Sequence, residues 1–145
     1  MIAYLDTSAF VPMMVREPSS EACRDLWDKA GSLVSTRLLH VEATAALARA
    51  ANAGRIRKSS LPDRLARLEE LRQRIQMIEL DEPLLENAAW FAATFGLRGY
   101  DATHCAAGVA IGSEGSVLAS GDRKMLEIWS DLGFSTFDPN RSGSG

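Results

Sequence analysis

Short apolar stretches separated by helix-like segments are the feature that most constrains the fold of this chain. Strand-type stretches at 2–5, 33–35, 77–80, 117–119 and 134–137 alternate with segments of helical periodicity. Parallel strands need a long crossover between them, and that crossover is usually a helix, so the alternation predicts a parallel sheet with helices on both faces. We therefore expect a three-layer α/β/α fold around a central parallel sheet of four to five short strands.

The segments between these strands carry residues that favour helix ends. We expect helices over 9–15, 20–30, 36–53, 83–95, 101–111 and 122–132. A further helix opens at Ser59 or Ser60. Its apolar residues recur at the spacing of one buried helical stripe, namely Leu61, Leu65, Leu68, Leu71 and Ile75. Pro12 lacks the N–H that a helix needs beyond its first turn, so it should strain or shorten the first helix.

Length and composition predict one globular domain. We expect it to span 1–139, because 145 residues can bury a sizeable core, and we expect the Gly/Ser-rich tail 140–145 to be disordered. No apolar run reaches the ~20 residues of a membrane span, and the N-terminus does not resemble a signal peptide. We therefore expect a cytoplasmic protein with no membrane association, in which Cys23 and Cys105 are free, buried thiols.

The charge distribution argues against binding nucleic acid by bulk charge alone, because the formal net charge is −3. It does not exclude a nucleic-acid partner, since segment 49–76 holds eight Lys or Arg and only three acids. On a continuous helix four arginines would share one face, either for RNA or an acidic partner or as an ion-paired surface: Arg57, Arg64, Arg67 and Arg74. Three tryptophans lie in helical patterns that favour core packing: Trp27, Trp90 and Trp129.

Three aspartates stand where a strand or turn gives way to a helix, namely Asp6, Asp101 and Asp122. The simplest interpretation of each one is a helix N-cap. The carboxyl edge of a parallel sheet is also where α/β folds bind ligands, so each one is equally a candidate site residue. The two roles are compatible, and position alone does not decide between them.

Glu42 is more informative because it lies more than one turn inside its expected helix and cannot cap it. Its helical neighbours are apolar: Leu38, Leu39, Ala45 and Ala46. A glutamate on an apolar stripe costs desolvation free energy unless it meets a cation or hydrogen-bond donors. An arginine such as Arg37 or Arg49 would satisfy Glu42, and a metal ion would do so as well.

Convergence of all four acids would require a cation. Two carboxylates about 4 Å apart repel each other by about 4 kcal/mol at an effective dielectric of about 20. Ligation by oxygen alone, with no Cys or His cluster at ligand spacing, favours Mg²⁺, with Mn²⁺ as a substitute, over Zn²⁺. Magnesium commonly meets substrate phosphates, so the acids point to phosphoryl chemistry.

Four motifs, in order along nearly the whole chain, resemble those of the PIN-domain ribonucleases and, within them, the VapC toxins of bacterial toxin–antitoxin pairs. They are Leu5-Asp6-Thr7-Ser8-Ala9, which continues to Arg16-Glu17-Pro18; His40-Val41-Glu42-Ala43; Tyr100-Asp101-Ala102-Thr103-His104; and Ser120-Gly121-Asp122-Arg123. Any one of these motifs is weak evidence. The four together, at the expected separations, are specific.

The resemblance implies a PIN-like fold and a Mg²⁺- or Mn²⁺-dependent endoribonuclease that acts as the toxin of a type II toxin–antitoxin pair. Asp6 and Asp101 would be the surest metal ligands, and Glu42 and Asp122 would complete the catalytic site. Hydroxyl groups would support it by hydrogen bonds, at Thr7 and Ser120. The implied partners are an RNA substrate, a cognate VapB-like antitoxin and a second copy in a homodimer. The Ala-rich and Leu-striped helices would form the antitoxin groove or the dimer surface.

Two other functions stay in competition. The chain could be a non-catalytic receiver-like or PIN-derived interaction module, although retention of all four acids argues against it. A phosphatase with an Asp nucleophile ranks last, because Leu5-Asp6-Thr7-Ser8 lacks a second Asp at plus two. His104, three residues after Asp101, either carries a proton near the site or serves the structure only.

Overall fold

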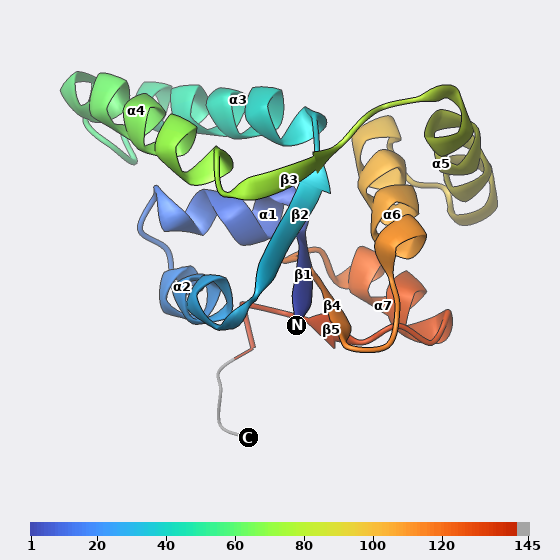
Figure 1. Cartoon of the computed structure of the whole chain (residues 1–145). Coiled ribbons are helices and arrows are strands. Elements are labelled where there is room, and N and C mark those ends of the chain that lie inside the picture. Colours follow the sequence, from blue (N-terminus) through green and yellow to red (C-terminus); the bar gives the residue numbers. More distant parts are fainter. Residues whose placement is uncertain (142–145) are drawn as a thin grey trace.

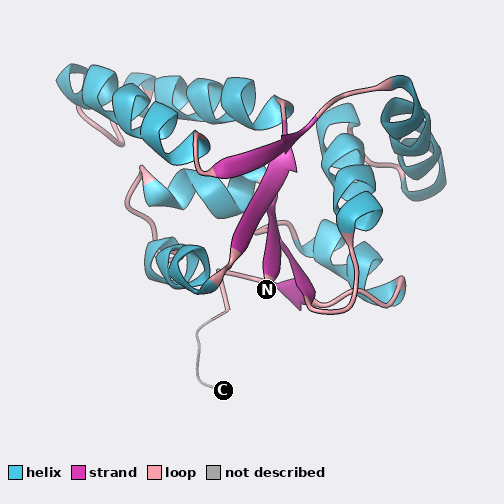
Figure 2. Ribbon diagram, viewed as in Figure 1, coloured by secondary structure: helices cyan, strands magenta, loops and turns pink. Residues whose placement is uncertain are grey.

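The computed structural model describes residues 1–141 and has a five-stranded sheet at its centre (Figure 1). All strand pairs are parallel, and the strand order is β3-β2-β1-β4-β5. The strands are β1 (Ile2–Leu5), β2 (Ser32–Thr36), β3 (Ile75–Ile78), β4 (Ser116–Ala119) and β5 (Thr136–Phe137). The predicted three-layer α/β/α fold is confirmed, and Figure 2 shows the single sheet between two sets of helices.

The strand order places a crevice beside the central strand. From β1 the chain builds outward through β2 and β3 on one side, and it returns to the other side of β1 with β4 and β5. Ala3 of β1 is therefore paired with Leu33 of β2 and with Val117 of β4. Ligands of open α/β sheets bind outside the carboxyl ends of the strands where the order reverses. That point lies between β1 and β4, directly beyond Leu5.

Side chains of β1 alternate between the two faces of the sheet, as the two-residue period of a strand requires. Ala3 and Leu5 join a core on one face, whereas Tyr4 joins a second core on the other face. The first core is covered by α1 (Thr7–Phe10), the 3-10 helix η1 (Val11–Met13), α2 (Ser20–Lys29), α3 (Leu38–Asn52) and α4 (Leu61–Arg72). The second core is covered by α5 (Glu82–Phe95), α6 (Gly99–Ile111) and α7 (Arg123–Asp131).

Two predicted element boundaries differ from the structure. Pro12 divides the expected helix at 9–15, so α1 ends at Phe10 and continues as the 3-10 helix η1. The leucine stripe is part of α4, in which Leu68 and Leu71 are buried, but the helix ends before Ile75. Ile75 instead begins β3, where it is paired with Leu33, so the third strand lies two residues earlier than predicted.

The arginines expected on one helical face do not share one. A short 3-10 helix, η2 (Lys58–Ser60), separates Arg57 from α4, and Arg74 follows the end of α4. Arg74 lies over the Trp27 ring, 5.3 Å from its centroid, and Arg67 forms an ion pair with Glu70. Of the predicted roles, an ion-paired surface therefore describes Arg67. The prediction that the four arginines form one continuous stripe on a helix is wrong.

The tryptophans divide into two classes. Trp27 and Trp129 are buried, as predicted, but Trp90 is 57% exposed on α5.

Cys23 and Cys105 are free and buried, which confirms the prediction made for both thiols. Among residues 1–141, no helix combines the length and apolarity that a membrane crossing requires. Of the predicted disordered tail, residues 142–145 lie outside the described residues, and the backbone N–H of Asn140 donates to Asp138.

Candidate active site

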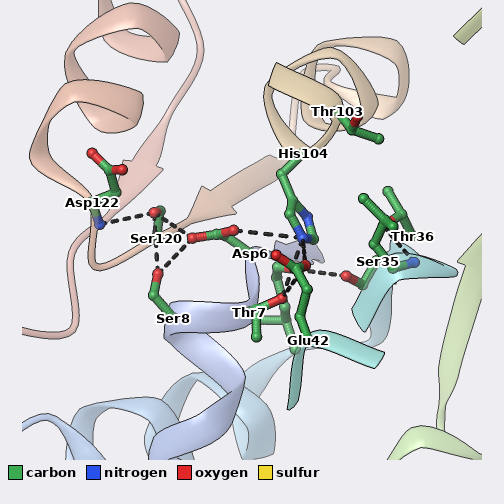
Figure 3. Close-up of polar contacts among 12 residues, drawn as sticks. Asp6, Thr7, Ser8, Ser35, Thr36, Glu42, Thr103, His104, Ser120 and Asp122 are labelled. Atoms are coloured by element: carbon green, nitrogen blue, oxygen red, sulfur yellow. Dashed lines mark hydrogen bonds and ion pairs between the residues drawn. The ribbon is translucent and has the colours of Figure 1, made fainter. Parts of the chain in front are cut away.

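Asp6 lies immediately after β1, at the carboxyl edge of the sheet, and its side chain is almost fully buried. It occupies the N-cap position of α1 but makes no capping hydrogen bond with its side chain. Its Oδ2 atom instead accepts hydrogen bonds from the hydroxyls of Ser8, at 2.6 Å, and Ser120, at 2.8 Å (Figure 3). The capping interpretation is therefore wrong for Asp6, and its carboxylate is oriented by two hydroxyls.

Glu42 reaches the same crevice from α3. Its Oε1 atom accepts a hydrogen bond from Thr7 at 2.7 Å and one from His104 Nε2 at 2.6 Å. Neither arginine considered from the sequence is its partner, because Arg37 forms an ion pair with Glu79 and Arg49 forms none with Glu42. The cation that compensates for the burial of Glu42 is a histidine from α6.

His104 connects the acids across the sheet and is fully buried. Its Nδ1 atom is 2.7 Å from the hydroxyl of Tyr4, and its Nε2 atom lies 3.7 Å from Asp6 Oδ1. Figure 3 shows the imidazole between Asp6 and Glu42. Sequence reasoning left the role of His104 open and missed Tyr4. The only sequence indication of Tyr4 was a polar hydroxyl in an otherwise aliphatic buried strand.

The pKa directions describe an ion pair between His104 and Glu42. Burial alone would lower the pKa of His104, but the hydrogen bond that it donates to Glu42 and the charges of Asp6, Glu42 and Asp101 raise it. Burial alone would raise the pKa of Glu42, but the hydrogen bond and charge of His104, with the Thr7 hydroxyl, lower it. Both directions favour an imidazolium that donates to a carboxylate.

Asp101 is the third residue of α6 and is half-buried. Burial raises its pKa, and the charges of the three other candidate acids raise it further: Asp6, Asp122 and Glu42. His104 opposes the increase. The pKa shift of Asp101 therefore reflects the charges of three acids that come from other segments of the chain.

Asp122 caps α7. Its Oδ1 atom accepts hydrogen bonds from the backbone N–H groups of Lys124, at 2.9 Å, and Met125, at 3.2 Å. The capping interpretation is therefore correct here. Ser120 connects Asp122 to Asp6, because its hydroxyl donates to Asp6 and accepts from the Asp122 backbone N–H at 2.9 Å. A carboxylate has a second oxygen, so a cap and a metal ligand can be the same residue.

The donor set has the chemistry of a site for a hard divalent cation. It consists of carboxylate and hydroxyl oxygens, with the only imidazole already engaged by Tyr4 and Glu42. Within residues 1–141, no three acidic, histidine or cysteine side chains are arranged closely enough to enclose a metal ion as they stand. The set nevertheless fits a cation, because a cation would offset the charges of the three acids that, after burial, raise the pKa of Asp101.

Comparison with known proteins agrees with the fold. The family model for the PIN domain matches residues 3–128. Ribonuclease VapC45 from Mycobacterium tuberculosis is 35% identical over 124 residues, which cover 86% of each chain. Ribonuclease VapC46 from the same species is 31% identical over 137 residues, covering 94% of this chain and 97% of that relative.

Among solved structures, VapBC2 from Rickettsia felis, bound to a DNA fragment from its promoter, matches with a TM-score of 0.65 at 14% identity. That match covers 95% of this chain and 100% of the other. At this identity it shows a shared fold. Since the family model spans most of the chain and two relatives match along nearly all of it, the chain belongs to the PIN-domain family, in the group that contains the VapC proteins.

Proposed function

We propose that this protein is a metal-dependent endoribonuclease that acts as the toxin of a toxin–antitoxin pair. The observation that carries the proposal is a cluster of acids at the edge of the sheet where the strand order reverses. Ser120 joins Asp6 to Asp122, and His104 lies between Asp6 and Glu42. The charges of these three acids also raise the pKa of Asp101. The names of the relatives, which are VapC ribonucleases, support the same activity. Together, the cluster of acids and the names of the relatives support hydrolysis of RNA phosphodiesters.

Asp6 and Asp101 are proposed to hold the cation, and Glu42 and Asp122 are proposed to complete its surroundings directly or through water. Mg²⁺ is the expected ion and Mn²⁺ a substitute, because all the donors are oxygen atoms. When bound, a divalent cation lowers the pKa of a coordinated water and neutralises charge on phosphoryl oxygens.

The side chains around the acids hold them in place for this role. Ser8 and Ser120 donate to the same oxygen of Asp6, and its other oxygen, Oδ1, lies 3.7 Å from His104 Nε2. Thr7 and His104 donate to the same oxygen of Glu42. Each carboxylate therefore keeps one oxygen available for a cation while the other fixes its orientation.

The proposed partners are a VapB-like antitoxin and, in a homodimer, a second copy of the chain. The structural neighbour from Rickettsia felis is a VapBC assembly, which supports an antitoxin partner for a chain of the same fold. The exposed helices α3 and α4 pack against each other outside the sheet, and they are the proposed antitoxin or dimer surface.

Replacement of Asp6 by asparagine tests the activity. Asp6→Asn keeps the shape of the side chain but removes the charge, so RNA cleavage in Mg²⁺ should fall about 100-fold or more. Cleavage of an RNA oligonucleotide is measured on gels for the parent, for Asp6→Asn and for Glu21→Gln, which changes an exposed acid of α2 as the control.

The folded state of each variant is checked by circular dichroism. A folded Asp6→Asn protein that cleaves RNA at the parent rate contradicts the proposed site. Cleavage that persists unchanged in EDTA contradicts metal dependence. If neither the parent nor any variant cleaves RNA in Mg²⁺ or Mn²⁺, the non-catalytic interaction module becomes the better account.

A further inference from the structure

A cleft of about 720 Å³ begins at the candidate active site and extends along α3. At one end it is lined by Thr7, Ser8 and Glu42, which support or belong to the acid cluster. Along its length it is lined by small residues of α3, Ala45 and Ala46. A ligand in this cleft would therefore contact Glu42 and two of the hydroxyls that hold the acids, those of Thr7 and Ser8. The cleft volume is within the range of about 300–1,000 Å³ that is usual for ligand clefts.

Two arginines from different parts of the chain give this cleft positive charge. Arg49 of α3 and Arg98, the residue before α6, both line the cleft and are exposed. Neither forms an ion pair with another residue among those described, whereas Arg55, which also lines the cleft, is paired with Glu17 at 2.8 Å. Arg49 and Arg98 are thus free to bind anionic groups of a ligand.

Tyr100 lines the same cleft one residue before Asp101, and 61% of its surface is exposed. Its ring is therefore accessible to a ligand that enters the cleft. A ring beside the acid cluster, flanked by an arginine, has the features of a stacking platform for a nucleobase. Tyr4 differs, because its ring is buried in the core and its hydroxyl is hydrogen-bonded to His104.

We propose that this cleft binds single-stranded RNA, with Arg49 and Arg98 on phosphates that flank the cleaved bond and Tyr100 stacked on a base. The inference rests on the proposed ribonuclease function and assigns substrate-binding residues to it. The carboxylates repel a phosphate chain, so cations must hold RNA beside them, and these two arginines are in position. A duplex hides its bases from a stacking ring, whereas a single strand exposes them.

The binding test uses full-length protein carrying Asp6→Asn, so that cleavage does not consume the probe. The probe is a short fluorescein-labelled RNA of mixed sequence, either single-stranded or annealed to its complement. Into this background are introduced Arg49→Gln, Arg98→Gln, Tyr100→Ala and Tyr100→Phe. Arg57→Gln and Trp90→Ala are the matched controls, because they remove an exposed arginine and an exposed aromatic ring outside the cleft.

Each cleft arginine variant should weaken single-strand binding several-fold and reduce the salt dependence, by about 0.7 in the slope of log affinity against log salt for each phosphate contact. Tyr100→Ala should weaken binding about 5- to 150-fold, while Tyr100→Phe, which keeps the ring, and both controls should bind as the Asp6→Asn protein does. In the active background, the same changes should raise KM for single-stranded RNA more than they lower kcat.

The inference is wrong if the cleft variants bind single-stranded RNA as tightly as the controls, even when the parent cleaves RNA in Mg²⁺; the proposed function would then stand without it. It is also wrong if duplex RNA binds as tightly as the single strand. A loss of affinity confined to the cognate antitoxin would identify the cleft as a protein-binding surface and would overturn the inference.

Discussion

At the scale of single residues, the site depends on how a buried glutamate keeps its charge. Glu42 lies on an apolar side of α3, where burial opposes ionisation. The imidazolium of His104 and the hydroxyl of Thr7 outweigh this effect. His104 in turn depends on Tyr4, which occupies its Nδ1 atom at the far side of the ring. The charge of Glu42 is thus maintained by a chain of three side chains that begins in β1.

Replacing Tyr4 by phenylalanine tests this chain of contacts. Tyr4→Phe keeps the ring that packs edge-on against Trp129 but leaves Nδ1 of a fully buried histidine without its partner. The free energy of unfolding should fall by about 1–3 kcal/mol. Urea denaturation measures it, with Tyr100→Phe as the control, since that tyrosine is exposed. Equal stability of the two variants would contradict the role of the Tyr4 hydroxyl.

Sequence pattern was enough to single out the candidate acids, but their connections could not be predicted. Asp6 and Asp122 stand at strand-to-helix boundaries, and Glu42 is conspicuous on an apolar helical face, so local pattern identifies them. The partner of Glu42 is 62 residues away in sequence, and the partner of His104 Nδ1 is 100 residues away. Nearby arginines were therefore the only candidates that helical spacing could offer for Glu42.

At the scale of elements, the packing of α6 against α7 holds Asp101 and His104 at the sheet. Gly108 of α6 lies under the ring of Trp129 of α7, and a Cβ atom added at Gly108 would be 2.8 Å from the ring. The Trp129 Nε1–H also donates to the backbone carbonyl of Cys105 at 3.1 Å. The two helices therefore approach closely only because position 108 has no side chain.

Gly108→Ala should destabilise the protein although alanine is the better helix former. Removal of glycine from a helix gains about 0.5–1 kcal/mol, but crowding against a buried ring costs about 1–3 kcal/mol, so the free energy of unfolding should fall. Gly99→Ala in the same helix meets no atom within 4 Å and serves as the control. Thermal unfolding measures the stability of both variants and of the parent. A Gly108→Ala variant more stable than the parent would contradict the close packing.

Element types were predictable where local chemistry is strong, and boundaries were not. The alternation of strands and helices gave the correct order, and Pro12 was correctly expected to shorten the first helix. Ile75 continues the leucine spacing of α4, yet it pairs with Leu33 in the sheet. Whether Ile75 joins the helix or the sheet depends on where β2 lies in space. The periodicity of one segment carries no information about the position of another. The prediction that Trp90 packs in the core was wrong for a similar reason, because its helix is only partly covered by the rest of the protein.

At the scale of the whole molecule, the fold buries proton-bearing groups in both cores. Burial raises the pKa of Cys23 and of Cys105 from 9.0 to about 12. Burial, followed by the charge of Asp6, raises the pKa of Tyr4 well above 10.0. All three groups therefore keep their protons in the folded protein at a pH where the unfolded chain releases them.

Stability should decline in alkaline solution for this reason. Below about pH 9 both states are protonated at these groups and their contribution to stability is complete. Between about pH 9 and about pH 12 the unfolded chain binds fewer protons, so the free energy of unfolding falls as pH rises. Urea denaturation across this interval measures the slope. The double variant Cys23→Ala/Cys105→Ala should show a shallower slope, and an unchanged slope would contradict the shifted thiols.

The central claim is that the four carboxylates form one cation site that drives RNA cleavage. Mn²⁺ binding, followed by electron paramagnetic resonance, and RNA cleavage should be measured in the same samples of the parent and of Asp101→Asn. We expect cleavage in the parent to rise in step with bound Mn²⁺, and both to be lost in Asp101→Asn. Undiminished Mn²⁺ binding by a folded Asp101→Asn protein, or parent cleavage without bound metal, would contradict the account.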